Sequence, residues 1–180
     1  MKLPNEWNGP LDSLCLPMGL ASITFGSEFN QPLNVPLPPT LYRISFGYSF
    51  NQNLRDAQLP DQLEAIEFGS CYDQPLTGVT LPSRLHTLRF GTNFNQSMDN
   101  VTLPRTLVYL EFGREFNQPI DFLLLPSTLQ SLTFGKEFNQ DVQSVKWPLS
   151  LAVLRFGEHF SNASSLRFDD EHRVETIRFQ

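Results

Sequence analysis

The sequence has only two cysteines among its 180 residues. Cys15 and Cys71 lie far apart and at different phases of the pattern around them, so we expect no disulfide between them. Chains without structural disulfides are typical of a reducing compartment. The scarcity of cysteine therefore favours an intracellular protein.

Basic residues are scarce as well. Thirteen Lys and Arg stand against nineteen Asp and Glu, which leaves a formal net charge of −6 and a pI near 5.0. A nucleic-acid-binding surface needs a basic stripe, so we expect no nucleic acid partner. No apolar run approaches the length of a membrane span, and no signal peptide precedes the first pattern. We therefore expect no membrane contact and, if the chain is complete, a cytoplasmic location.

Phenylalanine, in contrast, is abundant: the chain has sixteen. Phe-Gly dipeptides recur after 21 and then 22 residues, and Leu-Pro (once Trp-Pro) keeps the same period. The dipeptides begin at Phe25, Phe46, Phe68, Phe90, Phe112, Phe134 and Phe156. A fixed period of this length is the signature of a solenoid, in which each repeat packs only on its neighbours.

We number the repeat from Leu107 as position 1, so that one copy reads LVYLEFGREFNQPIDFLLLPST. Seven complete copies are flanked by a partial copy at each end. The first partial copy has Trp7 at position 10, where the complete copies have Phe or Tyr. At the other end, residues 174–179 repeat the start of the unit. The pattern predicts a single solenoid domain over residues 1–180.

Each repeat contains a strand pattern. Positions 4 and 6 are apolar and alternate with variable positions 3 and 5, which is the two-residue period of a strand. Proline at position 20 of six of the seven complete copies leaves no room for a helix. We predict an all-β, right-handed solenoid with one short parallel strand per 22-residue repeat and little or no α-helix. Glycine at position 7 indicates either a backbone conformation that other residues avoid or a close approach of the neighbouring coil.

The inward positions are predicted to form a spine and a ladder. The phenylalanines of the Phe-Gly dipeptides form the spine, whereas Phe122 lies off it. In one copy the inward set is Leu107, Leu110, Phe112, Phe116, Ile120, Leu123 and Leu125. Amides at position 11 are expected to satisfy backbone groups and to pair between coils; they belong to Asn30, Asn51, Asn95, Asn117 and Asn139. Asp73 and Ser161 interrupt this column, and Asp73 should be a weak rung because it lacks the amide donor.

The pattern L-P-x-S/T-L-x-x-L-x-F-G-x-x-F-N-Q-P-I/L resembles the FNIP repeat family over nearly the whole chain. The resemblance implies a leucine-rich-repeat-like solenoid of a kind often found beside F-box or kinase domains in longer proteins. No Gly-rich phosphate loop or kinase signature accompanies it here. Departures from the pattern are modest: Tyr72-Asp73 replaces Phe-Asn, and Trp147 replaces Leu.

Catalytic and metal-binding patterns are weak, so we predict neither an enzyme nor a cofactor. His86, His159 and His172 lie in different repeats without metal-ligand spacing. The run at 169–172 is better explained as a polar cover over the last coil than as a cation site. Glu67 and Glu111 share position 5 two repeats apart, as paired carboxylates of a glycosidase could, but Arg89 lies between them. An arginine there would hold both carboxylates ionised, which is wrong for a general acid.

The outward positions of the strands predict a surface for a protein partner. Tyrosine and arginine are enriched at binding hot spots, and they are unevenly spread here. The candidate residues are Tyr42, Arg43, Tyr48, Glu67, Arg89, Tyr109, Glu111 and Arg114. Alternatively, the charges satisfy one another across strands and the tyrosines cover backbone. We interpret the chain as a non-catalytic protein-interaction scaffold; the alternatives are a structural spacer in a longer protein and, remotely, carbohydrate binding or hydrolysis.

The two ends differ in sequence. Met1 to Leu3 enters as half a strand, which should leave an unpaired edge with the apolar Leu11, Leu14 and Leu16 beneath it. Such an edge invites pairing with another chain, so we expect self-association through this end or a further N-terminal segment that caps it. Charges at Arg173, Glu175 and Arg178 should discourage pairing at the other end.

Overall fold

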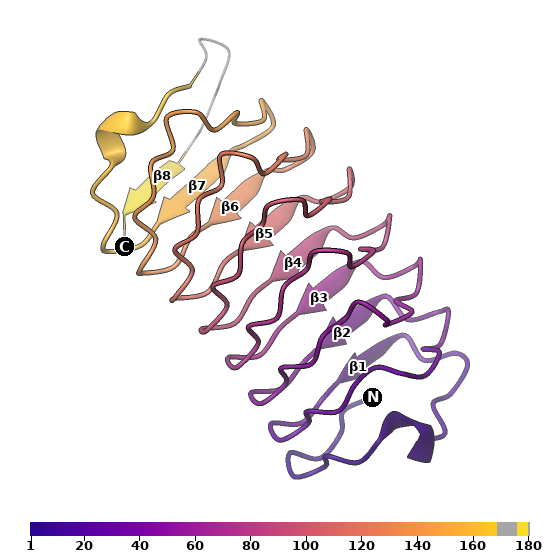
Figure 1. Cartoon of the computed structure of the whole chain (residues 1–180). Helices are drawn as coiled ribbons and strands as arrows, with labels where there is room; N and C mark the ends of the chain where they lie inside the picture. Colours follow the sequence, from indigo (N-terminus) through magenta and orange to yellow (C-terminus); the bar gives the residue numbers. More distant parts are fainter. Residues whose placement is uncertain (169–175, 180) are drawn as a thin grey trace.

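A computed structural model describes residues 1–168 and the backbone of 176–179. Eight short strands form one parallel sheet in chain order (Figure 1). They are β1 (Ser22–Thr24), β2 (Arg43–Ser45), β3 (Ala65–Glu67), β4 (Thr87–Arg89), β5 (Tyr109–Glu111), β6 (Ser131–Thr133), β7 (Val153–Phe156) and β8 (Thr176–Phe179). Two 3-10 turns, η1 (Leu11–Ser13) and η2 (Ala163–Ser165), are the only helical elements of the described residues.

The strands pair at equivalent positions of the repeat. Ile23 lies opposite Ile44, and Leu110 lies opposite Leu132, so that each position-4 side chain stacks on the next. A slip of one residue would turn the apolar side chains outward, and this penalty sets the register. The repeat period therefore becomes one coil of the stack.

The coil is right-handed, as predicted. In Figure 1 the return segments pass in front of the sheet, and successive coils advance from β1 towards β8. Strands β1 to β7 each end at a Phe-Gly turn, and each Leu-Pro corner leads into the next strand. The molecule thus has a sheet side, a return side and two rows of turns.

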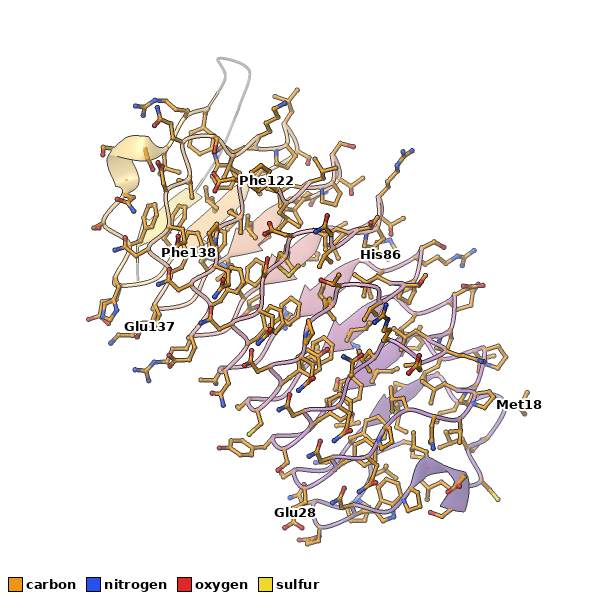
Figure 2. All side chains as sticks on the ribbon, viewed as in Figure 1. Met18, Glu28, His86, Phe122, Glu137 and Phe138 are labelled. Carbon is orange, nitrogen blue, oxygen red and sulfur yellow. The ribbon has the colours of Figure 1, made fainter. Side chains whose placement is uncertain are left out.

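The core lies between the sheet and the return segments, and the predicted inward set fills it. Leu107, Phe112 and Phe116 are all buried, whereas Phe122 is 80% exposed. Leu125 is the one member of that set that remains half-buried. Figure 2 shows the side chains between the two layers, with Phe138 among them. The prediction of the inward set is therefore confirmed.

Aromatic rings run through the core as two parallel columns. Rings at position 6, such as Phe90 and Phe112, lie 5.5 Å apart between coils. Rings at position 10, such as Phe94 and Phe116, lie 6.0 Å apart. Within a coil the two columns touch, with 3.9 Å between the ring centroids of Phe112 and Phe116. Each ring thus contacts rings above, below and beside it, and such stacked pairs add to the free energy of burial.

Close approach of neighbouring coils explains the glycine at position 7. A Cβ built on Gly113 would lie 1.7 Å from the carbonyl oxygen of Gly91. The same contact recurs along the column, and at its start the carbonyl of Pro4 would meet a Cβ on Gly26 at 1.9 Å. Positive φ belongs to Gly78 instead, which lies outside this column. Of the two explanations offered by the sequence, the structure supports the steric one.

The asparagine ladder is present, and its hydrogen bonds are accepted by the side-chain oxygen of each asparagine. Asn30 Oδ1 accepts the backbone N–H of Asn51 at 2.9 Å and Nε2 of Gln52 at 2.9 Å. The ladder therefore joins each asparagine to the next coil's backbone and to the glutamine at position 12.

The prediction that Asp73 is a weak rung is wrong. Its Oδ1 accepts the N–H of Asn95 and Nε2 of Gln96, both at 2.9 Å. A carboxylate supplies the acceptor that the ladder needs, and the missing amide donor has no part in these bonds. Ser161 closes the described column by donating both its N–H and its hydroxyl to Asn139.

A second polar column lies at position 22 and was not predicted. Thr106 Oγ1 is 2.9 Å from the carbonyl oxygens of both Ser83 and Leu85 in the preceding coil. Thr128 repeats this arrangement one coil later, with 2.8 Å to Arg105 and Leu107. These hydroxyls satisfy carbonyl groups at the Leu-Pro corner, which explains the S/T of the repeat pattern.

We expect Phe112→Ala to lower the free energy of unfolding by about 3–5 kcal/mol, because it leaves a cavity that touches two neighbouring coils. Phe122→Ala should have a far smaller effect, since that side chain is already exposed. Urea denaturation of the two variants checks this. Equal losses would contradict the core described above.

We expect Asp73→Asn to leave stability nearly unchanged, because the acceptor oxygen is kept. Asp73→Ala should lower the free energy of unfolding by about 1–3 kcal/mol, since the N–H of Asn95 loses its partner. Thermal unfolding of both variants at equal pH tests the ladder. A large loss in the Asn variant would show that the charge itself matters.

Candidate functional site

The candidate residues are distributed along the sheet side and the turns beside it. Arg43, Glu67, Arg89 and Glu111 lie in the successive strands β2 to β5, and Tyr109 also lies in β5. Tyr42 directly precedes β2, while Tyr48 and Arg114 follow the Phe-Gly turns. The predicted surface is therefore one strip over four coils, with Tyr48 and Arg114 at its edge.

Four of the charges form a chain of ion pairs across the strands. Arg43 and Glu67 approach to 3.3 Å, Arg89 and Glu67 to 3.9 Å, and Arg89 and Glu111 to 3.4 Å. Ser45 also donates to Glu67 at 2.9 Å. The predicted alternation of Glu67, Arg89 and Glu111 is confirmed, and Arg43 extends it diagonally.

A second charge cluster lies where the strands end. Arg114 contacts Glu115 at 3.4 Å and Glu137 at 3.9 Å, and Glu137 also contacts His159 Nδ1 at 2.7 Å. Glu137 lies on this edge in Figure 2, away from His86 on the opposite edge. Arg114 is thus part of a turn cluster separate from the ion-pair chain of the sheet.

The three tyrosines of the candidate surface are exposed. Tyr42 is 45% exposed, Tyr48 61% and Tyr109 47%. Tyr42 and Tyr109 lie three coil steps apart, or about 14 Å at the usual strand spacing. The structure does not bring them into one pocket. The surface they define is flat and extended, which suits a macromolecular partner better than a small ligand.

Hollows in the surface lie on other sides of the molecule. One of about 510 Å³ lies at the first Leu-Pro corners, between Leu14 and Val35. Another, of about 610 Å³, lies on the return side between Asn100 and Phe122. The repeat pattern does not predict these hollows. The signal that could have found the second is the apolar Phe122 and Leu124 at positions that are otherwise mostly polar.

The titratable groups give little support for catalysis. Burial raises the pKa of Tyr72, whose hydroxyl has no hydrogen-bond partner among the described residues. A hydrogen bond from Lys136 lowers the pKa of Glu158, an exposed group on a turn. Glu67 and Glu111, the glycosidase alternative, both contact Arg89. Both carboxylates are therefore members of the ion-pair chain.

In the described part of the chain, no group of three or more His, Cys, Asp or Glu is placed to hold a metal ion. Nor does that part contain a helix long and apolar enough to cross a membrane. The acidic run at 169–172, considered above as a cation site, lies outside the described residues. Cys15 and Cys71 are both free thiols, as predicted.

The N-terminal end pairs with β1 as half a strand. Leu3 donates to the carbonyl of Thr24, and Thr24 donates to the carbonyl of Met1. Leu11, predicted to lie beneath this edge, is the first residue of η1 and is only 1% exposed.

Leu14 and Leu16 are half-buried at the same end. Self-association through this end stays a prediction. At the other end, Arg173 and Glu175 lie outside the described residues, and for Arg178 only the backbone is described.

The fold and its repeated contacts define a right-handed, leucine-rich-repeat-like solenoid. A family model for the FNIP repeat matches residues 7–36, 35–71, 72–115 and 116–159. The chain therefore belongs to the FNIP repeat family.

Among solved structures, the chain is similar to CroV588, described as a novel circular LRR protein. The two are 40% identical with a TM-score of 0.83, over 88% of this chain and 24% of the other. The chain thus spans about a quarter of the length of CroV588. A comparison with curated proteins found no match.

We expect the ion-pair chain to contribute little to stability. A double-mutant cycle with Glu67→Gln and Arg89→Gln should give a coupling energy of about 0.2–1 kcal/mol, because both side chains are partly exposed and screened by water. Urea denaturation of the four proteins at low salt measures it. A coupling of several kcal/mol would mean that these charges are structural and not available to a partner.

Proposed function

We propose that the chain is a non-catalytic protein-interaction scaffold that binds its partner on the sheet side. The observation that carries this proposal is the contrast between the inward and the outward positions of the repeat. Inward positions repeat nearly the same side chains in every coil, whereas outward positions 3 and 5 differ from coil to coil. Solenoids commonly use such an extended, rigid surface for recognition.

The exposed tyrosines supply the anchors of this surface. Tyr42 and Tyr109 combine apolar area with a hydroxyl and lose little conformational entropy on binding. Arg43 and Arg89 lie between them, with side chains 50% and 52% exposed. Exposed ion pairs are worth little, so a partner can exchange them at low cost in free energy. The strip therefore offers aromatic anchors within a field of exchangeable charge.

The second candidate is a structural spacer within a longer polypeptide. It is supported by the share of CroV588 that the chain covers, 24%, and by a sheet in which each strand pairs only with the strands of adjacent coils. Such a segment could hold other domains at a fixed separation. A spacer needs no selective surface, and this distinguishes it experimentally from a scaffold.

We expect replacement of Tyr42, Arg43 and Tyr109 by Ala to abolish capture of the main partner from native cells while changing the melting temperature only slightly. The hot-spot residues would be lost, but no buried side chain would change. Proximity labelling followed by quantitative mass spectrometry measures the capture.

A matched control carries Gln58→Ala, Thr80→Ala and Gln143→Ala, three exposed changes on the return side. This control should retain the partner. Unchanged capture by the folded sheet-side variant would reject binding on the sheet side. Absence of any selectively captured protein would favour the spacer.

A further inference from the structure

An apolar ridge on the return side is formed by Phe122 and Leu124, which are 80% and 83% exposed. Leu123 between them is buried at position 17. The extended backbone alternates its side chains, so burial of Leu123 places both neighbours outward. Five of the other complete copies have Asp, Gly, Asn or Ser at position 16, and Pro, Gln, Thr or Lys at position 18, whereas the seventh has Leu166 and Phe168, which are half-buried against the core. The ridge is therefore a local feature of one coil and is not required by the repeat.

Hollows lie next to this ridge. One, of about 610 Å³, is lined by Asp99, Asn100, Val101, Thr102, Phe122 and Leu124. A second, of about 440 Å³, shares Leu124 and reaches Arg105 and Pro126 at the Leu-Pro corner. Volumes of this size are in the range of sites that enclose ligand groups. The ridge thus forms the wall of a hollow that can receive an apolar side chain.

Two acidic side chains accompany the larger hollow: Asp99 lines it, and Asp121 directly precedes Phe122 of the ridge. Asp99 and Asp121 occupy position 15 of adjacent coils, both are exposed, and neither has an ion pair in the described part of the chain. Asp121 accepts a hydrogen bond from Ser144, which leaves its charge uncompensated. Like charges on adjacent strands repel each other. A cation from a partner would relieve that repulsion beside the hollow and its apolar wall.

We propose that this ridge and hollow bind a short segment of a partner protein in which a large apolar side chain is adjacent to Lys or Arg. The apolar side chain enters the hollow beside Phe122, and the basic side chain lies at Asp99 and Asp121. Binding removes exposed apolar surface from water, which provides affinity, while the charges select against acidic segments. This site is on the opposite side from the sheet strip and is independent of the function proposed above.

The test is selection of a random peptide library displayed on phage against the immobilised full chain. Enriched peptides should share a large apolar residue next to Lys or Arg. A synthetic copy of one enriched peptide, labelled with a fluorophore, then gives dissociation constants by polarisation. Phe122→Ser with Leu124→Ser should weaken its binding by about tenfold or more, because the ridge supplies the apolar contact.

Charge reversal provides the sharper measurement. The double variant Asp99→Lys with Asp121→Lys should bind the basic peptide about tenfold more weakly. It should instead favour a version of the peptide with Glu in place of Lys or Arg. The matched control, Asp56→Ser with Gln58→Ser, changes the same positions as the ridge in another coil and should bind normally. The sheet-side triple variant should also bind normally, which separates this site from the proposed scaffold surface.

Three outcomes would overturn the proposal. If the wild-type chain enriched no peptides beyond those enriched by the Phe122→Ser/Leu124→Ser variant, the ridge would select no peptide. Enrichment of acidic or uncharged sequences would reject the assigned partner chemistry. Sedimentation that shows self-association of the wild-type chain, lost in the ridge variant, would assign the ridge to a second copy. All variants are exposed-site changes, and thermal unfolding confirms that each is folded before binding is compared.

Discussion

The structure depends on the close stacking of one coil on the next. At position 7 the backbone of each coil approaches so closely that a Cβ on Gly113 would lie 1.7 Å from the preceding carbonyl oxygen. This contact holds the Phe-Gly turns in register. The aromatic columns and the asparagine oxygens can then repeat their contacts from coil to coil. Any side chain at position 7 would push the coils apart and weaken all three sets of contacts together.

The same stacking divides the chain into a uniform interior and a variable exterior. Inward side chains must match the coil above and the coil below, so their size and shape are restricted. Outward side chains meet water and are free to differ. Both surfaces proposed here lie on the exterior: the tyrosines and ion pairs on the sheet side, and the ridge at Phe122 and Leu124 on the return side. Membership of the FNIP repeat family accounts for the interior and leaves the exterior particular to this chain.

Sequence reasoning succeeded where one column of side chains decides the structure. The period, the strand at L-x-x-L-x-F and the phenylalanine spine all follow from spacing. The ion pair of Glu67 with Arg89 followed from their shared column. The prediction for Asp73 was wrong because residue type does not show which atom of a position-11 side chain makes the hydrogen bonds. In the structure only the side-chain oxygen makes them, and Asp73 supplies one. Thr106 was missed because its bonds run to carbonyls of the preceding coil, and those become neighbours only after stacking.

The sequence by itself determined the repeat, its strand and the inward set, because apolar side chains at a fixed period have one way to leave water together. Only the tertiary structure decided which explanation holds for glycine at position 7, since the clash is between coils. It also decided that Leu11 is buried as the first residue of η1 and that Arg43 joins the ion-pair chain. The hollow beside Phe122 likewise exists only between two stacked coils. These features depend on distances between residues about one repeat apart, and such distances are set only when the coils pack.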